Sequence, residues 1–164
     1  MIFKAPSKDF WHGKRVLVTG HSGFKGMWLS LCLHRLGANV SGISLLPESS
    51  PNLYDLIDFQ NIGESIFCDI RDFKKLSDKF QAVDPEFIFH MAAQPLVRKS
   101  YAYPLETFSS NVMGTVNVLE CSRHAKVIKL VYASSSSCYG IAQTPTSENH
   151  PINPLYPYAI SKYQ

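Results

Sequence analysis

A glycine-rich segment, Thr19–Gly26, constrains the fold of this chain more than any other feature. It follows Arg15–Thr19, a short β-branched run that is typical of a buried strand. After the glycines the apolar residues change to helical spacing, until Gly37 ends the segment as a glycine commonly ends a helix. These apolar positions are Phe24, Met27, Trp28, Leu31 and Leu36. The pattern therefore predicts a strand, a glycine turn and a helix.

The same alternation continues along the chain. Further strands are predicted at 39–44, 65–68, 86–91 and 126–133, and further helices at 71–82 and 107–124. The last of these helices is predicted to keep one apolar face, formed by Phe108, Val112, Val116 and Leu119. Strands that alternate with helices indicate an α/β fold, a doubly wound, Rossmann-type parallel sheet with helices on both faces.

Length and composition indicate one domain, residues 1–164. At 18.4 kDa and 45% hydrophobic residues, the chain can bury one sizeable core. The proline-rich segment 144–157 precedes a helix that is predicted to start at Tyr158, and the sequence ends at Gln164 within two turns. We therefore expect a domain that is incomplete at its C-terminus, either a fragment or a truncated product.

Charge and hydropathy exclude two classes of partner. The net charge is +3 and the basic residues are scattered, which argues against nucleic-acid binding. No apolar run approaches the ~18 residues of a membrane span, so we expect a soluble, cytoplasmic protein. The cysteines lie far apart in apolar or small-residue runs, which predicts buried, reduced thiols and no metal site. They are Cys32, Cys68, Cys121 and Cys138.

The glycine loop, as we call Thr19–Gly26, has the chemistry of a dinucleotide site. Gly20, Gly23 and Gly26 allow a tight turn, a close approach of a pyrophosphate and close packing of helix on strand. The helix that follows offers backbone N–H groups to the phosphates. Residues 41–46 contain neither the acid that holds ribose hydroxyls nor an arginine for a 2′-phosphate, so this segment leaves both NAD and NADP open. Asp69, beside Ile70, holds either the adenine edge or the N-terminus of the next helix.

A second group of residues suits proton transfer. Four serines, Ser134–Ser137, follow the predicted fifth strand, and Tyr158 and Lys162 lie four residues apart on one helix face. An ammonium beside a phenol makes the phenol a usable base, and a serine hydroxyl can share the hydrogen bond to the reacting oxygen. We interpret Ser135, Tyr158 and Lys162 as the catalytic residues of an alcohol oxidation by hydride transfer.

In this order the motifs resemble the extended short-chain dehydrogenase/reductase family that acts on nucleotide sugars. Thr19–Gly26 is similar to the family's TGxxGFxG loop, 90–94 to its nicotinamide-side segment, and Tyr158–Lys162 to its YxxxK motif. The resemblance implies a nucleotide-sugar substrate, a homo-oligomer when full length and a sugar-binding lobe beyond residue 164. It implies cofactor contacts from Gly20, Ser22, Gly23, Phe24, Lys25, Gly26, Asp69, Ile70, Met91, Ala92, Ala93, Gln94, Asn111, Tyr158 and Lys162.

Within this family, Gly20–Gly26 and His90–Tyr101 are most similar to the CDP-glucose 4,6-dehydratase subgroup. The resemblance implies that NAD takes a hydride from sugar C4, that water leaves across C5 and C6, and that the hydride returns to C6. Sugar dehydratases of the family carry an acid directly after the catalytic Ser or Thr, where this chain has Ser136. That segment is similar to the epimerase and reductase branches, so a 4-epimerase, a reductase and a catalytically silent NAD(P)-binding domain stay open as alternatives.

Overall fold

The computed structural model describes residues 7–141 and 144–163 of the chain. Its centre is a parallel five-stranded sheet with the strand order β3-β2-β1-β4-β5. The strands are β1 (Arg15–Thr19), β2 (Asn39–Ser44), β3 (Gly63–Phe67), β4 (Phe87–His90) and β5 (Lys129–Tyr132). The predicted doubly wound α/β fold is confirmed. The direction of strand succession reverses between β1 and β4, which is where such sheets bind ligands.

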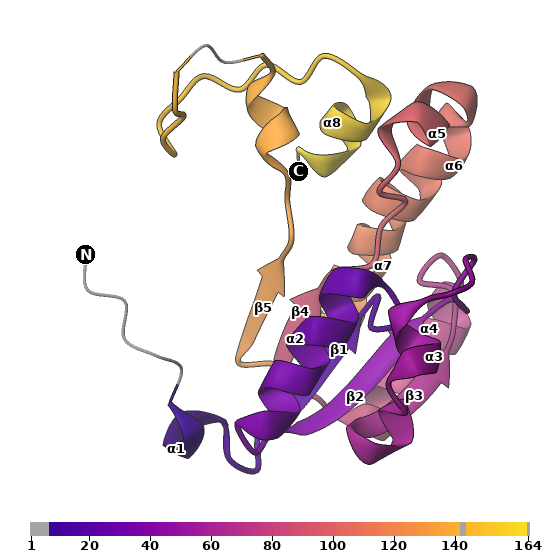
Figure 1. Ribbon diagram of the computed structural model, residues 1–164, viewed down its shortest axis with the longest axis vertical. Helices are drawn as coiled ribbons and strands as arrows, with labels where there is room; N and C mark the ends of the chain where they lie inside the picture. Colours follow the sequence, from indigo (N-terminus) through magenta and orange to yellow (C-terminus); the bar gives the residue numbers. More distant parts are fainter. Residues whose placement is uncertain (1–6, 142–143, 164) are drawn as a thin grey trace.

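Helices cover both faces of the sheet, as Figure 1 shows. One face carries α1 (Lys8–Trp11), α2 (Phe24–Arg35), α3 (Leu53–Leu56) and the 3₁₀ turn η1 (Phe59–Asn61). The other face carries α4 (Phe73–Val83) and α7 (Gly114–His124). In β1, Val16 and Val18 pack toward α2 while Leu17 packs toward α4 and α7, and all three are fully buried. Burial on both faces explains why the strand reads as a continuous apolar run.

Of the five apolar positions whose spacing predicted helix α2, only Met27 is fully buried. Phe24 is 70% exposed and Trp28 is 47% exposed, whereas Gly26, Met27, Ser30 and Leu33 face the sheet. The Ser30 hydroxyl donates to the Gly26 carbonyl at 2.9 Å, so its polar group is satisfied inside the helix. Small residues occupy much of this buried face because the helix lies close to β1. The spacing of the apolar residues alone does not reveal such a close approach.

The helical segment after β4 is longer and more divided than predicted. It comprises α5 (Val97–Ala102), α6 (Pro104–Phe108), the π-helical turn η2 (Ser109–Met113) and α7. The predicted apolar face is wrong as a buried face, because Phe108, Val116 and Leu119 are 36–50% exposed. The buried side is mostly polar or small, and it comprises Thr107, Asn111, Gly114, Thr115, Val118 and Cys121.

Several further predictions need correction. The third strand begins two residues earlier than predicted, and the fourth and fifth strands are shorter. The last helix, α8 (Pro157–Lys162), starts one residue before Tyr158. The last two of the four serines lie in a 3₁₀ turn, η3 (Ser136–Tyr139), together with Cys138 and Tyr139. Cys32 is exposed, because it lies on the outer side of α2, whereas the other three cysteines are buried and all four are free thiols.

Helix α8 lies beyond the carboxyl end of β5 and packs against α5 and α6 (Figure 1). The carboxyl ends of β1 and β4 open toward the same edge of the sheet. This edge therefore collects the glycine loop, the segment after β4 and α8. Across residues 7–141 and 144–163, none of the helices has the length and apolar character needed to span a membrane.

Candidate active site

The glycine loop is built from close backbone contacts. Gly20 has a φ of +76°, and a Cβ added there would lie 2.8 Å from the Ala92 nitrogen. A Cβ on Gly26 would overlap the Gly20 carbonyl. At Gly23 an added Cβ would lie 3.3 Å from that carbonyl, and the Gly23 N–H donates to it at 3.1 Å. Gly20 and Gly26 are thus required by the fold itself, whereas Gly23 is exposed and an added Cβ there would make one tight contact without overlap.

The N-terminus of α2 is suited to an anion. Gly23 is the residue that precedes the helix, so no side chain caps the first turn, and that turn contains no acidic residue. The first N–H groups of a helix have no partner inside the helix, and the helix dipole favours negative charge there. A twelve-residue helix with an uncapped glycine start fits a pyrophosphate. The predicted contacts Gly23, Phe24 and Lys25 are all exposed at this point.

The end of β2 is polar but uncharged. Ser44 is 5% exposed, and its hydroxyl oxygen is one of two buried side-chain polar atoms that lack a hydrogen-bond partner among the described residues. The Ser22 hydroxyl donates to the Leu45 carbonyl at 2.8 Å, which ties the glycine loop to this strand end. Ser44 occupies the place where the sequence lacked an acid, and it was missed because a serine in an apolar strand carries no signal of its own.

His21, in the glycine loop, is fully buried among aromatic rings. Its Nε2 lies 2.7 Å from the Ser65 hydroxyl, which lies 2.9 Å from the Tyr54 hydroxyl. Its ring packs on Phe59 and stands where a side chain on Gly42 would have to go. Burial lowers the pKa of His21 to about 4. The imidazole is therefore neutral at physiological pH and anchors the glycine loop to β2 and β3.

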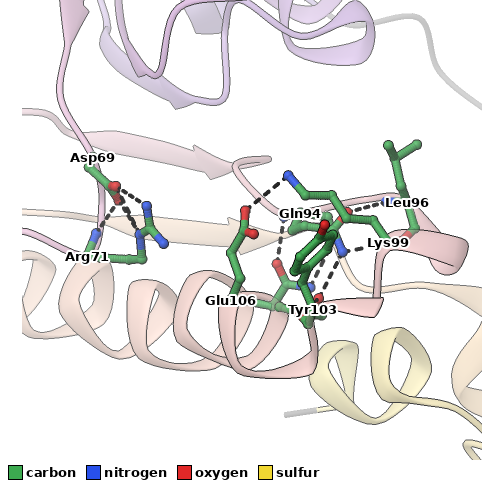
Figure 2. Close-up of polar contacts among 9 residues, drawn as sticks. Asp69, Arg71, Gln94, Leu96, Lys99, Tyr103 and Glu106 are labelled. Carbon is green, nitrogen blue, oxygen red and sulfur yellow. Dashed lines mark hydrogen bonds and ion pairs between the residues drawn. The ribbon is translucent and has the colours of Figure 1, made fainter. Parts of the chain in front are cut away.

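Asp69 follows β3 and forms a salt bridge with Arg71. The Arg71 guanidinium donates to both carboxylate oxygens at 2.6–3.0 Å, and the Arg71 backbone N–H donates at 2.9 Å, as Figure 2 shows. This pairing lowers the pKa of Asp69. The alternative prediction, that Asp69 starts the next helix, is wrong, because Asp72 is the N-cap and accepts from the Lys75 N–H. Ile70 points into the core, against Gly114.

The segment after β4, Met91–Gln94, is held by Asn111 in the π-helical turn. The Gln94 N–H donates to the Asn111 side-chain oxygen at 2.7 Å, and the Asn111 amide donates to the Gln94 carbonyl at 3.2 Å and to Ser161 of α8 at 2.8 Å. Figure 2 shows the Gln94 side chain in turn held to the backbone of Leu96. Asn111 is 1% exposed, and through these hydrogen bonds it joins the Met91–Gln94 segment to α8. Such π turns recur at functional sites.

His90, the last residue of β4, is also buried, and both nitrogens of its ring have hydrogen-bond partners. Its Nδ1 lies 2.6 Å from the Thr19 hydroxyl and its Nε2 lies 3.0 Å from the Thr115 hydroxyl. Thr19 also accepts from the Ala92 N–H at 3.2 Å. Burial, followed by the charge of Lys162, lowers the pKa of His90 to about 4. The sequence included this histidine only in the resemblance of residues 90–94 to a nicotinamide-side segment and of His90–Tyr101 to a subgroup segment, and gave it no role, because its partners come from distant elements.

The serine corner, which we define as Tyr132–Tyr139 together with α8, brings the predicted catalytic elements side by side. The Ser134 hydroxyl donates to the Lys162 carbonyl at 2.8 Å, and the Tyr132 hydroxyl donates to the same carbonyl at 3.5 Å, so Tyr132 and Ser134 join the end of β5 to α8. The Ser135 hydroxyl accepts from the Ser137 N–H at 3.2 Å and caps η3. Its own proton is left to donate to another acceptor. Tyr158 is half-buried, and its N–H donates to Ser100 of α5.

Lys162 is 3% exposed and lies over an aromatic ring. Its ammonium stands 4.2 Å from the ring centroid of Tyr132, which favours the cation. Burial outweighs this attraction and lowers the pKa of Lys162 to about 8. The pKa of Tyr132 is raised to about 12, mainly by burial. A lysine with a pKa this near to neutrality is typical of functional sites.

Among the described residues, no group of acids, histidines and cysteines has the arrangement of a metal site.

Comparison with known proteins identifies the family. Residues 17–164, nearly the whole chain, match the family described as GDP-mannose 4,6 dehydratase. The chain belongs to this family. It is 48% identical over 158 residues to CDP-glucose 4,6-dehydratase of Salmonella typhimurium, an alignment that covers 94% of this chain and 44% of that protein.

Epimerases are similar as well. A putative UDP-glucose 4-epimerase of Methanocaldococcus jannaschii is 39% identical over 140 residues, covering 77% of this chain and 46% of the relative. The solved structure of Thermus thermophilus UDP-glucose 4-epimerase in complex with NAD superposes with a TM-score of 0.81 at 31% identity, over 90% of this chain and 47% of that one. The chain thus spans less than half the length of these relatives.

Proposed function

We propose that the chain is the NAD-binding part of an enzyme that oxidises C4 of a nucleotide sugar, of the CDP-glucose 4,6-dehydratase type. The observation that carries the proposal is that the glycine loop, the Met91–Gln94 segment and α8 lie at the same edge of the sheet. Gly20 of the glycine loop abuts Ala92, Asn111 links Gln94 to Ser161, and Ser134 binds α8 to the end of β5. The 48% identity to the Salmonella dehydratase supports the substrate class.

The residues of the glycine loop and of Met91–Gln94 fit a dinucleotide. The uncapped start of α2 would take the pyrophosphate, with contacts from Gly20, Ser22, Gly23 and the first residues of α2. Asp69 and Ile70 lie on the β3 side, where adenine is proposed to bind. A related 4-epimerase was solved in complex with NAD, which supports NAD as the cofactor. When bound, NAD supplies the acceptor for the hydride that leaves C4.

The serine corner would accept the proton that leaves the C4 hydroxyl of the sugar. Tyr158 is the proposed base that takes the proton of the C4 hydroxyl, and Ser135, whose hydroxyl proton is left to donate, is the proposed hydrogen-bond donor to the C4 oxygen. Lys162 is proposed to hold the cofactor ribose and to favour the charged form of the phenol. The lowered pKa of Lys162, about 8, supports a role that depends on its position within a desolvated site.

A direct test is calorimetric titration of this chain with NAD. We expect one site per chain, and we expect it to be abolished by Gly23→Val, because a bulky side chain there would fill the space in front of the α2 N-terminus. Strand β1 and its core should remain folded, which circular dichroism would verify. Unchanged NAD affinity in the variant would contradict the assignment of the loop.

A 4-epimerase is the second candidate, and Ser136 favours it. Ser136 is exposed at the start of η3, in the position where dehydratases are expected to carry an acid. A serine hydroxyl is too weak an acid to assist loss of the C6 hydroxyl, an assistance worth ~100-fold or more in rate. Mass spectrometry of the product formed by the full-length enzyme from CDP-glucose separates the two candidates. A product lighter by one water identifies the dehydratase, and a product of unchanged mass that separates chromatographically from CDP-glucose identifies the epimerase.

Two further properties belong to the same proposal. Three buried free thiols are typical of a reducing compartment, which supports a cytoplasmic location. A homo-oligomer is proposed for the full-length protein. The apolar side chains exposed along α6, η2 and α7 support it, because such stripes commonly mark protein interfaces. They are Leu105, Phe108, Met113, Val116 and Leu119.

A further inference from the structure

The hydrogen bonds around His90 determine where each proton lies. The Thr115 hydroxyl donates to the Asn111 carbonyl at 2.5 Å, within the helix. A hydroxyl has one proton, so Thr115 can only accept at its contact with His90 Nε2, and that nitrogen must carry a proton. His90 Nδ1 is then the acceptor of the neutral ring, and the Thr19 hydroxyl donates to it. Thr19 is thereby free to accept from the Ala92 N–H.

These bonds form one directed chain across four elements. It runs from the Ala92 N–H through Thr19, His90 and Thr115 to the Asn111 carbonyl, and every proton along it is committed. Thr19 immediately precedes the glycine loop, and Ala92 is the residue that Gly20 abuts. Both ends of the chain therefore belong to parts of the proposed cofactor site, while its centre, His90, is 1% exposed.

We propose that His90 is a positioning residue that holds the Met91–Gln94 segment against the glycine loop, as a neutral imidazole with its proton on Nε2. The part of this inference that concerns NAD rests on the proposed function, whereas the proton arrangement does not. A second proton on His90 would face the Thr19 hydroxyl, which would have to turn its own proton away from the ring. Burial and the charge of Lys162 of α8 both disfavour this second proton, whereas the Tyr132 ring, 5.7 Å from the imidazole, is uncharged.

The role differs from simple filling of the core. A residue that only fills space could be replaced by an aromatic ring of similar size, because the surrounding packing would be kept. If the directed chain matters, the requirement is one acceptor toward Thr19 and one donor toward Thr115. The amide of glutamine offers both, and the ring of phenylalanine offers neither. Glutamine and phenylalanine at position 90 therefore give opposite expectations.

The test measures hydrogen exchange at the Ala92 amide and NAD affinity in His90→Gln and His90→Phe. We expect Ala92 protection and NAD affinity near the wild-type values in His90→Gln, and faster exchange with about tenfold weaker NAD binding in His90→Phe. Equal Ala92 protection in the two variants would overturn the proposal. If the wild-type chain binds no NAD, the proposed function fails, and the exchange result still decides the role of His90.

A second variant covers the case in which His90→Phe does not fold. Thr115→Val keeps the shape of the side chain and removes the acceptor for Nε2, so Ala92 exchange should again become faster. Ser122→Ala is the matched control, since Ser122 also donates to a carbonyl one turn back in α7, that of Val118 at 2.6 Å, outside the directed chain. Equal Ala92 protection in Thr115→Val and Ser122→Ala would overturn the proposal.

The protonation state has its own readout. In ¹⁵N spectra of the imidazole groups, the signals lost in His90→Gln belong to His90. They should show a protonated Nε2 and a bare Nδ1 from pH 8 down to pH 5, while N-acetylhistidine added as a reference titrates in this range. A His90 that titrates together with the reference, or that carries its proton on Nδ1, would contradict the assigned arrangement.

Discussion

The glycine loop and the serine corner lie at the same edge of the sheet but are held in place by different means. The loop is fixed by backbone packing, since Gly20 abuts Ala92 and Gly26 abuts Gly20, and by a buried His21. The corner is joined to the sheet by single side-chain bonds, such as that of Ser134 to Lys162, on an edge strand whose residues are only partly buried. The comparison teaches that local sterics define the first region, and long-range packing defines the second.

The largest effect is expected at Gly26. A methyl group there would overlap the Gly20 carbonyl, which is backbone and cannot move aside, so Gly26→Ala should lower the free energy of unfolding by about 3 kcal/mol or more. Gly23→Ala is the matched control, because its Cβ would lie 3.3 Å from the same carbonyl. It should cost less than about 1 kcal/mol in urea unfolding. Equal costs would contradict a loop defined by backbone contact.

The next effect lies in the serine corner and concerns rate. In the full-length enzyme, Tyr158→Phe removes the proposed proton acceptor and keeps the ring, so turnover should fall by ~100-fold or more while NAD affinity changes little. Lys162→Ala should lose both turnover and NAD affinity, since one ammonium is proposed to serve ribose and phenol. Steady-state kinetics and calorimetry would measure the two effects, and a Tyr158→Phe enzyme of full rate would refute the role.

How far the sequence predicts each region follows from the same difference. The spacing of Gly20, Gly23 and Gly26 after a β-branched run was enough to place the loop at the β1–α2 turn, because glycine is the residue that such contacts demand. The serine corner was predicted only as a set of residue types. That Ser134 rather than Ser135 binds Lys162, and that Lys162 lies over Tyr132, depends on how α8 packs against β5.

Buried polar residues explain the remaining failures of sequence reasoning. The buried side of the helical segment after β4 carries Asn111 and Thr115, which periodicity treats as surface positions, while Val116 and Leu119 are exposed. Similarly, the small residues Gly26 and Ser30 lie on the buried side of α2. In each case a specific hydrogen bond or a close backbone contact overrides the apolar pattern.

The two regions should also respond to pH in different windows. His21 and His90 have pKa values of about 4 in the folded chain and about 6.5 when unfolded, so the unfolded state binds more protons between these values. The free energy of unfolding should therefore fall as the pH falls from 6.5 to 5, by at most about 1.4 kcal/mol per pH unit for each histidine. Chemical denaturation at a series of pH values would measure this slope.

At alkaline pH the serine corner gives a trend of the same sign in a separate window. The pKa of Lys162 is lowered to about 8, so between pH 8 and 9 the unfolded state again binds more protons and stability should rise with pH. Above pH 9 the raised pKa of Cys121, about 11, acts with the opposite sign. Lys162→Met should remove the rise between pH 8 and 9 and leave the acid slope intact. A rise that persists in this variant would show that another group causes it.

The smallest effect is expected at the Asp69–Arg71 pair. Its geometry is bidentate, but Arg71 is 38% exposed and water screens the pair, so Arg71→Ala should change the free energy of unfolding by at most about 1 kcal/mol. Arg123→Ala is the matched control, because Arg123 makes a similar exposed pair with Glu120 on α7, far from the proposed site. Thermal unfolding of both variants would measure the effect. A markedly larger loss for Arg71 alone would show that the β3 edge is more strongly organised than the serine corner.

The central claim, that the glycine loop binds a dinucleotide pyrophosphate, is tested most directly by calorimetry of NAD with three chains. These are the wild type, Gly23→Val and Gly13→Ala, the last being a glycine of positive φ in the turn before β1, at the opposite edge of the sheet. Gly13→Ala strains the backbone without touching the loop, so it controls for lost stability. The account predicts NAD binding to the wild type and to Gly13→Ala and none to Gly23→Val. Binding of NAD by Gly23→Val with wild-type affinity would contradict it.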